Sequence, residues 1–412
     1  MNKKTSKEVR YHFGLLALFF CLTPWASWGT NALDSQPFPL LFSVAYILMF
    51  GRCMFVPRAY MSVAFMSAIF LCVAAAQLNA SAYQLVRASV NYITIPVVLI
   101  FYYDFAKRYS IPIAFIRRVN YLWIAVGVLE SYSPEFTSWA SALRTTAERG
   151  VTSLAPEPTF FAVYLIFSSW LILISENYKP TRISCFLIVI NIFCIVVLAK
   201  SSMGIMFLIP FGLVWYSGRY GFSYNILPFA LGIVLIGFVV HSQLELISQL
   251  FDGTRVGTIA ENLNQASIDA IILSDASINV RLEHVVVPIQ AFKENGFLPH
   301  GFSGYEAASI PIINSYNGFF WYSPGGDNIM SWTGSFLFEL GFLGVFYIAF
   351  LGYSCWDGRI NRLVELVTLL VLLITAIPLA FSLVPLVLAT LRIKGLKSYR
   401  RSNSTPIIYD KT

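Results

Sequence analysis

The chain alternates apolar runs with short polar connections over most of its length. A helix needs about 20 apolar residues to cross the hydrocarbon core of a bilayer, and most of these runs approach that length. The expected spans are 12–29, 39–56, 60–78, 84–103, 119–134, 159–175, 183–199, 203–217, 225–241 and 332–353. A further apolar run, 363–391, is too long for one untilted span, and Pro378 and Pro385 predict that it forms two short helices.

Two polar segments interrupt this pattern. The longer one runs from His241 to about Trp332, and the shorter one from Glu130 to Pro158. Loops this long are uncommon without a function, so the longer segment is expected to cover a functional site that the shorter one helps to build. The chain then divides into 1–241 with spans one to nine and the outer loop 130–158, a long loop 242–331, spans ten to twelve in 332–391, and a tail 392–412.

Composition narrows the class of protein. Of the 412 residues, 57% are hydrophobic and 12% are charged, and the mean hydropathy is +0.68. Soluble domains carry about 25% charged residues, so a soluble globular protein is excluded. The expected fold class is an all-α polytopic membrane protein with about 12 transmembrane helices. The six cysteines have neither metal-ligand nor paired disulfide spacing, and we interpret them as packing residues.

The distribution of positive charge orients the spans. With the N-terminus inside, the inner segments hold most of the 28 lysines and arginines, as the positive-inside rule requires. Both termini are then cytoplasmic, and both polar loops lie outside. The net charge of +7 is explained by these inner segments and by the basic tail after Arg392, which faces anionic lipid. Membrane lipids are expected partners, and nucleic acid is not.

The shorter polar loop carries candidate anion ligands, Arg144 and Arg149, before Glu157 and Pro158. Pro158 suits the first position of a helix, where its missing N–H would be unpaired anyway, and Glu157 lies beside the positive end of that helix. A guanidinium group can bind two phosphate oxygens at once, so one arginine is a candidate ligand for an anionic substrate. The alternative is a favourable helix start with two solvated arginines.

The longer loop contains a predicted amphipathic helix that begins near Asn279 and stops at Asn295-Gly296. Arg281, His284 and Pro288 share one of its faces, at spacings of three and seven residues. Such a helix is expected to lie across the outer leaflet with its polar face toward the spans. A solvated arginine and histidine are the alternative interpretation.

Three charges are expected in or near the bilayer: Arg87 in the fourth span, Lys200 between the seventh and eighth, and Glu339 in the tenth. A charge at mid-membrane costs about 2.5–3.5 kcal/mol on insertion scales, so idle ones are rare. Arg87 and Lys200 lie near the outer ends, where snorkelling lowers that cost. Arg87 is either a ligand or an interfacial anchor, and Glu339 either lines a wet cavity or forms an interhelical ion pair.

Arginines that converge from separate outer loops suit a lipid-linked diphosphate. They would neutralise the leaving diphosphate while a carboxylate or histidine takes a proton from an acceptor hydroxyl. The candidate phosphate ligands are Arg87, Arg144, Arg149, Lys200 and Arg281, and the candidate acid–base groups are Glu157, His284, His300 and Glu339. The identity of the base stays open. The sequence has no Gly-rich phosphate loop, no nucleophile elbow and no metal-binding spacing, so no metal or other cofactor is expected.

Several motifs, in this order, resemble those of the Wzy-type O-antigen polymerases, which join oligosaccharide repeat units. They are Arg149-Gly-Val-Thr-Ser-Leu-Ala-Pro-Glu157-Pro158, Ala199-Lys-Ser-Ser-Met-Gly204, Arg281 with Leu298-Pro-His-Gly-Phe-Ser-Gly304, and Glu339-Leu-Gly-Phe-Leu-Gly344. The resemblance covers spans five to ten. It departs from the family at Ser202-Met203, where relatives often have Ser-Arg, and Lys200 is a possible substitute.

The resemblance implies a GT-C-type membrane glycosyltransferase of the bacterial inner membrane. Its substrates would be undecaprenyl-diphosphate-linked oligosaccharides, with the growing chain transferred on the periplasmic face to the non-reducing end of a new unit. The family's functional arginines would fall on Arg149, with Arg144 as second choice, and on Arg281. Relatives work without a metal ion, and a Wzz-type chain-length regulator is an expected functional partner.

Two other functions remain open. The O-antigen ligase, which transfers a finished glycan to lipid A-core, has similar loops but typically a histidine before the tenth span, where this chain has Gly326-Asp327-Asn328. A lipid-linked oligosaccharide transporter would distribute charges through its spans and show inverted repeats. Here spans seven to nine are almost uncharged, so the sequence favours the polymerase.

Overall fold

The computed structural model is helical throughout the part of the chain that it describes. Described are residues 3–27, 36–51, 57–76, 82–133, 136, 150–221, 242–250, 257, 261–262, 264, 273, 276–302, 304–321, 329–357, 359–375 and 377–403. No strand occurs in these ranges, so the all-α class is confirmed. The expected span 225–241 lies outside the described residues.

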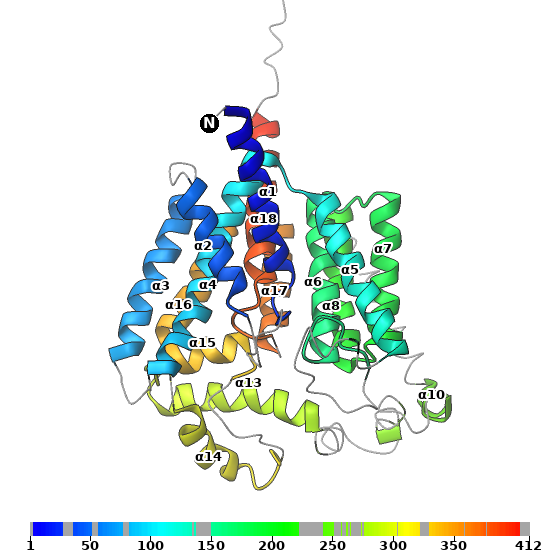
Figure 1. Cartoon of the computed structure of the whole chain (residues 1–412). Helices are drawn as coiled ribbons and strands as arrows, with labels where there is room; N and C mark the ends of the chain where they lie inside the picture. The colour runs from blue at the N-terminus through cyan, green and yellow to red at the C-terminus, as the bar shows by residue number, and fades with distance from the viewer. Residues whose placement is uncertain are drawn as a thin grey trace, which may run out of the picture.

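Helices fill most of the expected spans, and Figure 1 shows them side by side in a bundle. They are α1 (Lys3–Leu22), α2 (Phe38–Phe50), α3 (Arg58–Ala76), α4 (Ala82–Tyr109), α5 (Ile113–Tyr132), α6 (Pro158–Ser175), α7 (Arg182–Phe193) with its π-helical end η3 (Cys194–Leu198), α8 (Ser202–Tyr220), α15 (Trp332–Leu340), α16 (Phe342–Cys355), α17 (Ile360–Ile374) and α18 (Leu383–Asn403).

Two helices form the centre of the bundle. Every residue of α6 is buried, and α18 packs between α4 and α6. A helix that is apolar on all sides must be surrounded by others, and this explains the central place of the sequence PTFFAVYLIFSSWLILIS of α6. The bundle joins α1 to α4 on one side with α5 to α8 on the other, as Figure 1 shows.

Two of the described helices meet a strict test of length and apolar composition for crossing a membrane, Leu85–Tyr109 and Pro158–Ser175. The apolar helices Phe38–Phe50, Arg182–Leu198 and Phe342–Cys355 are shorter. The number of about 12 crossings therefore stays a prediction.

Some expected spans differ from the structure. Helix α1 ends at Leu22 and α2 at Phe50, before the expected ends of the spans 12–29 and 39–56. The run 332–353 is not one helix, because α15 ends at Leu340 and α16 begins at Phe342. Between them Gly341 has φ +58° and ψ −137°, a conformation that only glycine adopts readily. By contrast, the long run 363–391 does contain two helices, α17 and α18, separated by a turn that includes Pro378.

In the described part of the long loop, helices α10 (Leu244–Leu250), α13 (Ala276–Glu294) and α14 (Tyr305–Ser315) lie beyond the ends of the bundle. Figure 1 shows them at the end opposite the N-terminus, with α13 lying across the helix ends. Gly296, with φ +62°, ends the turn after α13, close to where the sequence predicted the stop. The chain thus places its long polar segment as a layer over one end of the bundle.

The opposite end carries a network of ion pairs that the sequence did not predict. Arg362 is 3% exposed and binds Glu365 at 2.5 Å and Asp357 at 3.2 Å. Nζ of Lys394 donates to the carbonyl oxygen of Ser175 at 2.5 Å, which links α18 to the end of α6. Buried charges need such partners. Arg362 also donates to the carbonyl oxygen of Leu391 at 2.9 Å, and this contact holds the start of α17 against α18.

Candidate functional site

Helix α13 carries the central residue of the candidate site. Its buried positions include Arg281, His284 and Pro288, so the face on which the sequence placed them turns inward, as expected. The rest of the helix is anchored by Val287 and Ala291, which join a small apolar cluster with Tyr305, Ile312 and Phe338. Helix α13 is therefore held against α14 and α15 while its N-terminal half reaches α6.

Arg281 contacts the start of α6. One of its terminal nitrogens donates to Oγ1 of Thr159 at 2.9 Å and lies 3.8 Å from Oε2 of Glu157. Its other terminal nitrogen donates to Oγ of Ser277, one turn earlier on α13. The side chain is 8% exposed. The guanidinium group is thus fixed in place by two hydroxyl groups and faces one carboxylate.

Glu157 is the residue before the first turn of α6. Its backbone is extended, and its carbonyl oxygen accepts hydrogen bonds from the N–H groups of Phe160 and Phe161. Its carboxylate caps no backbone N–H and retains 19% exposure. A carboxylate here interacts favourably with the helix dipole and remains accessible to a ligand beside Arg281.

The loop before Glu157 is built onto α5. The carboxylate of Glu130, 7% exposed, accepts hydrogen bonds from the N–H and hydroxyl of Thr152 and from the N–H of Ser153, at 2.5–3.0 Å. The hydroxyl of Ser153 donates to the carbonyl oxygen of Trp123. Hydrogen bonds to a charged group are the stronger ones, so Glu130 organises the backbone that leads to Glu157.

The turn between η3 and α8 packs against this loop. Val151 donates its N–H to the carbonyl oxygen of Leu198 at 2.9 Å, and a Cβ atom on Gly150 would lie 2.2 Å from the carbonyl oxygen of Ala199. Ser201 both caps α8 and donates its hydroxyl to Oγ1 of Thr159 at 3.4 Å. The exposed Lys200 lies in this turn with φ +47°. The structure therefore brings the Lys200 turn to the Arg281–Glu157 pair.

His284 lies one turn beyond Arg281 and is 3% exposed. Its Nδ1 accepts a hydrogen bond from the backbone N–H of Met330 at 2.8 Å, which joins α13 to the segment before α15. Burial lowers the pKa of His284 from 6.5 to about 4, so the ring is neutral at physiological pH. Nδ1, the nitrogen that could take a proton, already accepts the hydrogen bond from Met330. The role of His284 as a proton acceptor stays a prediction.

His300 and Glu339 lie toward the other end of α13. His300 stacks on Phe338 with ring centroids 4.4 Å apart, and its Nε2 lies 3.1 Å from the carbonyl oxygen of Ala291. Oε2 of Glu339 accepts a hydrogen bond from the hydroxyl of Tyr92 at 2.6 Å. Arg87 is half-buried on α4, the helix of Tyr92. These contacts join α15 to α4 and to the end of α13.

Arg144 and Arg149 lie outside the described residues, so their predicted role as phosphate ligands is untested. Sequence reasoning missed Thr159, Ser201, Ser277 and Glu130, which position the predicted residues. It also missed Glu283, a glutamate that is 1% exposed. The pKa of Tyr305 is raised, first by burial of the tyrosine and second by the negative charge of Glu283. The inward polar face of the predicted helix was the signal that could have found Ser277.

The described part of this site offers an anion the guanidinium of Arg281, and the exposed Lys200 lies in the neighbouring turn. Glu157 lies close enough to act on a ligand bound by Arg281, and the hydroxyl groups of Thr159 and Ser201 are neighbouring donors. Within the described ranges, no group of three His, Cys, Asp or Glu side chains is placed to hold a metal ion. Comparisons with protein families, with curated proteins and with solved structures found no match for this chain.

Proposed function

We propose that the protein is a bacterial inner-membrane glycosyltransferase that polymerises O-antigen repeat units. Its donor and acceptor are undecaprenyl-diphosphate-linked oligosaccharides, and the growing chain is transferred to the non-reducing end of a new unit on the periplasmic face. The observation that carries this proposal is the buried Arg281, held by Thr159 and Ser277 beside Glu157 at one end of a helix bundle.

The reaction needs a positive charge where the diphosphate leaves. In the proposed mechanism the guanidinium of Arg281 binds diphosphate oxygens as the bond from the anomeric carbon to the leaving oxygen breaks. Each charge-assisted contact contributes about 1.5–3 kcal/mol. Thr159 and Ser277 keep the guanidinium in position, so little reorganisation is required.

The acceptor hydroxyl must lose its proton as the new glycosidic bond forms. Of the four acid–base candidates, Glu157 is the one whose carboxylate lies next to Arg281 and is partly exposed. We therefore assign the base to Glu157. Arg149 and Lys200 are proposed as further diphosphate ligands, because Gly150, the neighbour of Arg149 in sequence, packs against the Lys200 turn. We also propose that a Wzz-type chain-length regulator is a functional partner of the protein.

A deletion strain tests the function. Loss of the polymerase leaves lipid A-core carrying one repeat unit, so the lipopolysaccharide ladder collapses to a single short band. Complete loss of O-antigen would instead indicate a ligase or a transporter, and an unchanged ladder would refute all three functions. Complementation with the wild-type gene is the control.

A further inference from the structure

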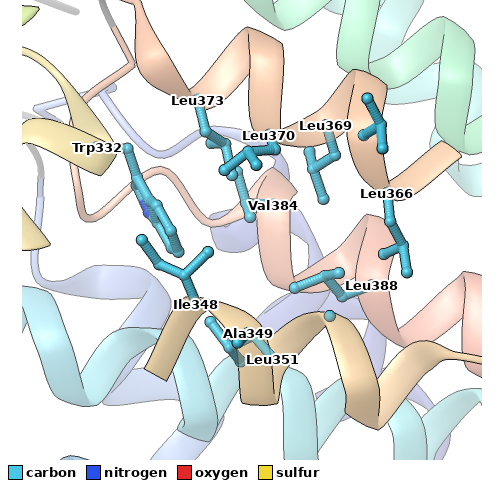
Figure 2. A pocket seen from close by; sticks show the side chains of 12 residues that line it. Trp332, Ile348, Ala349, Leu351, Leu366, Leu369, Leu370, Leu373, Val384 and Leu388 are labelled. Atoms are coloured by element: carbon cyan, nitrogen blue, oxygen red, sulfur yellow. The ribbon is translucent and has the colours of Figure 1, made fainter. Parts of the chain in front are cut away.

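An apolar groove runs between α16 and α17, with α18 as its floor. Figure 2 shows the side chains that line it. They are Trp332, Ile348, Ala349, Leu351, Gly352, Leu366, Val367, Leu369, Leu370, Leu373, Val384 and Leu388. Nε1 of Trp332 is the one polar side-chain atom in this set, and among the described residues it has no hydrogen-bond partner. The groove therefore suits a hydrocarbon chain.

The groove opens at the surface of the bundle. Val367 and Leu370, which line it, are 50% and 38% exposed. Its volume is about 210 Å³. An apolar cavity of roughly 150 Å³ stays dry and accepts benzene, so this groove has room for at least one isoprene unit while the rest of a long chain lies in the bilayer.

One end of the groove lies near the candidate site. Trp332 begins α15 at this end, and two residues earlier Met330 donates its N–H to His284. His284 follows Arg281 by one turn of α13. Ser331, which lies between Met330 and Trp332, donates its hydroxyl to the carbonyl oxygen of Ile374 at the end of α17. Helix α17 forms the other wall of the groove. A short run of contacts thus joins the groove to the proposed diphosphate ligand.

We propose that this groove seats the polyprenyl chain of the lipid-linked substrate. The inference rests on the proposed function, because it requires a substrate whose polar head lies at Arg281 and whose tail extends into the membrane. Continuity with Arg281 favours the polyprenyl chain over a phospholipid acyl chain, which has no need of that site. The groove would hold the first isoprene units and so orient the diphosphate.

Gly352 provides a precise test. It lines the groove, and a Cβ atom added to it would have no heavy atom within 4 Å. A Cβ atom at this position therefore meets no clash, and we expect a larger side chain built on it to occupy the groove. Replacing a helical glycine also favours the helix. Tyr353, the next residue, is 70% exposed and does not line the groove, so it offers a matched control.

The experiment uses the full chain in nanodiscs with two photoreactive probes. One is a polyprenyl diphosphate with a diazirine in its first isoprene units, and the other is phosphatidylglycerol with a diazirine in an acyl chain. Mass spectrometry locates the labelled peptides in wild type, Gly352→Phe, Tyr353→Trp and a second groove-filling variant, Ala349→Trp. Thermal unfolding of each variant identifies any that fail to fold.

We expect the polyprenyl probe to label α16 and α17 in wild type and Tyr353→Trp. A side chain that fills the groove should lower this labelling about tenfold. The polyprenyl chain would then lose the apolar surface that it buries in the groove, and this loss weakens binding. Polyprenyl labelling elsewhere, or equal labelling by the phospholipid, would overturn the inference, as would a groove covered by a second copy of the chain.

The two proposals can fail separately. If the groove is not labelled while a deletion strain still loses its ladder, the groove inference alone falls. If the groove is labelled but deletion leaves the ladder intact, the polymerase proposal falls, and the protein binds polyprenyl lipids for another purpose.

Discussion

Arg281 keeps a charge where little water reaches it. Its side chain is 8% exposed, and its donors meet Thr159, Ser277 and, at 3.8 Å, the carboxylate of Glu157. A charge buried to this degree is stable only with partners, and a more strongly charged anion could replace the long contact to Glu157. This local arrangement explains how one arginine can be both fixed and available.

His284 predicts a pH dependence of stability. Burial holds its pKa near 4, against 6.5 when unfolded, so the folded state binds fewer protons between these values. Stability is therefore complete above about pH 6.5 and is lost as the pH falls toward 4, by on the order of 2–3 kcal/mol. His284→Asn, whose side-chain oxygen can still accept from Met330, should flatten this dependence. Thermal unfolding of both proteins from pH 7.5 to 4 measures it, and equal slopes would contradict the assignment.

Glu130 predicts a loss of order in the loop before Glu157. In Glu130→Gln, three hydrogen-bond donors on Thr152 and Ser153 lose their charged acceptor. Each hydrogen bond to a charged group is worth about 1.5–3 kcal/mol. We expect a lower unfolding temperature and faster proteolysis of the loop. Glu245→Gln, an exposed glutamate on α10, is the control and should change neither. A Glu130→Gln variant as resistant as wild type would show that the loop is held by other contacts.

Sequence reasoning found some of these residues and missed their supports for a physical reason. Arg281 and Glu157 carry charge in an apolar chain and so are conspicuous. Their supports are neutral hydroxyl groups, Thr159 and Ser277, or backbone groups such as the Met330 N–H that occupies His284. Contacts of this kind join segments far apart in sequence, and no local pattern marks them.

At the scale of elements, α13 and the α15–α16 break show what periodicity can and cannot predict. The spacing of Arg281, His284 and Pro288 predicted both the helix and its inward face. The break at Gly341 escaped notice because the residues on both sides are apolar and helical. It is imposed by packing, since the Leu298–Pro299 backbone approaches where a Cβ atom would lie.

Gly341 predicts a large effect of a small substitution. In Gly341→Ala the new Cβ would lie 2.5 Å from the backbone of Leu298 and Pro299, and φ +58° with ψ −137° is strained for alanine. We expect a loss of about 1–3 kcal/mol from strain alone, seen as a lower unfolding temperature. Gly352→Ala on α16, where the added Cβ meets nothing within 4 Å, should be neutral or stabilising. Equal effects of the two substitutions would contradict the role of Gly341.

At the scale of the whole molecule, the bundle separates two kinds of surface. Lys107 and Arg108 lie in the last turn of α4 and Lys179 in the connection from α6 to α7, at helix ends that the charge pattern assigned to the inside. Figure 1 shows α13 and α14 at the other end of the bundle. Composition predicted the helical class. Which helices contact each other depends on side-chain packing and could not be read from apolar runs that resemble one another.

This arrangement predicts opposite labelling of two exposed lysines. In a background without native cysteines, Lys293→Cys on α13 should react in intact spheroplasts with a membrane-impermeant maleimide. Lys179→Cys, between α6 and α7, should react only after permeabilisation. The reverse pattern, or reaction of both in intact spheroplasts, would contradict the expected orientation.

The lipopolysaccharide ladder of an Arg281→Ala strain is the most direct test of the proposed role of Arg281 in polymerisation. We expect the variant to be present in the membrane at the wild-type level but to yield only lipid A-core with one repeat unit. Arg281→Lys should restore little, since an ammonium cannot reproduce the planar donor fork of arginine. Lys293→Ala, an exposed cation on the same helix, should keep a full ladder. A normal ladder from Arg281→Ala would show that polymerisation does not depend on this arginine.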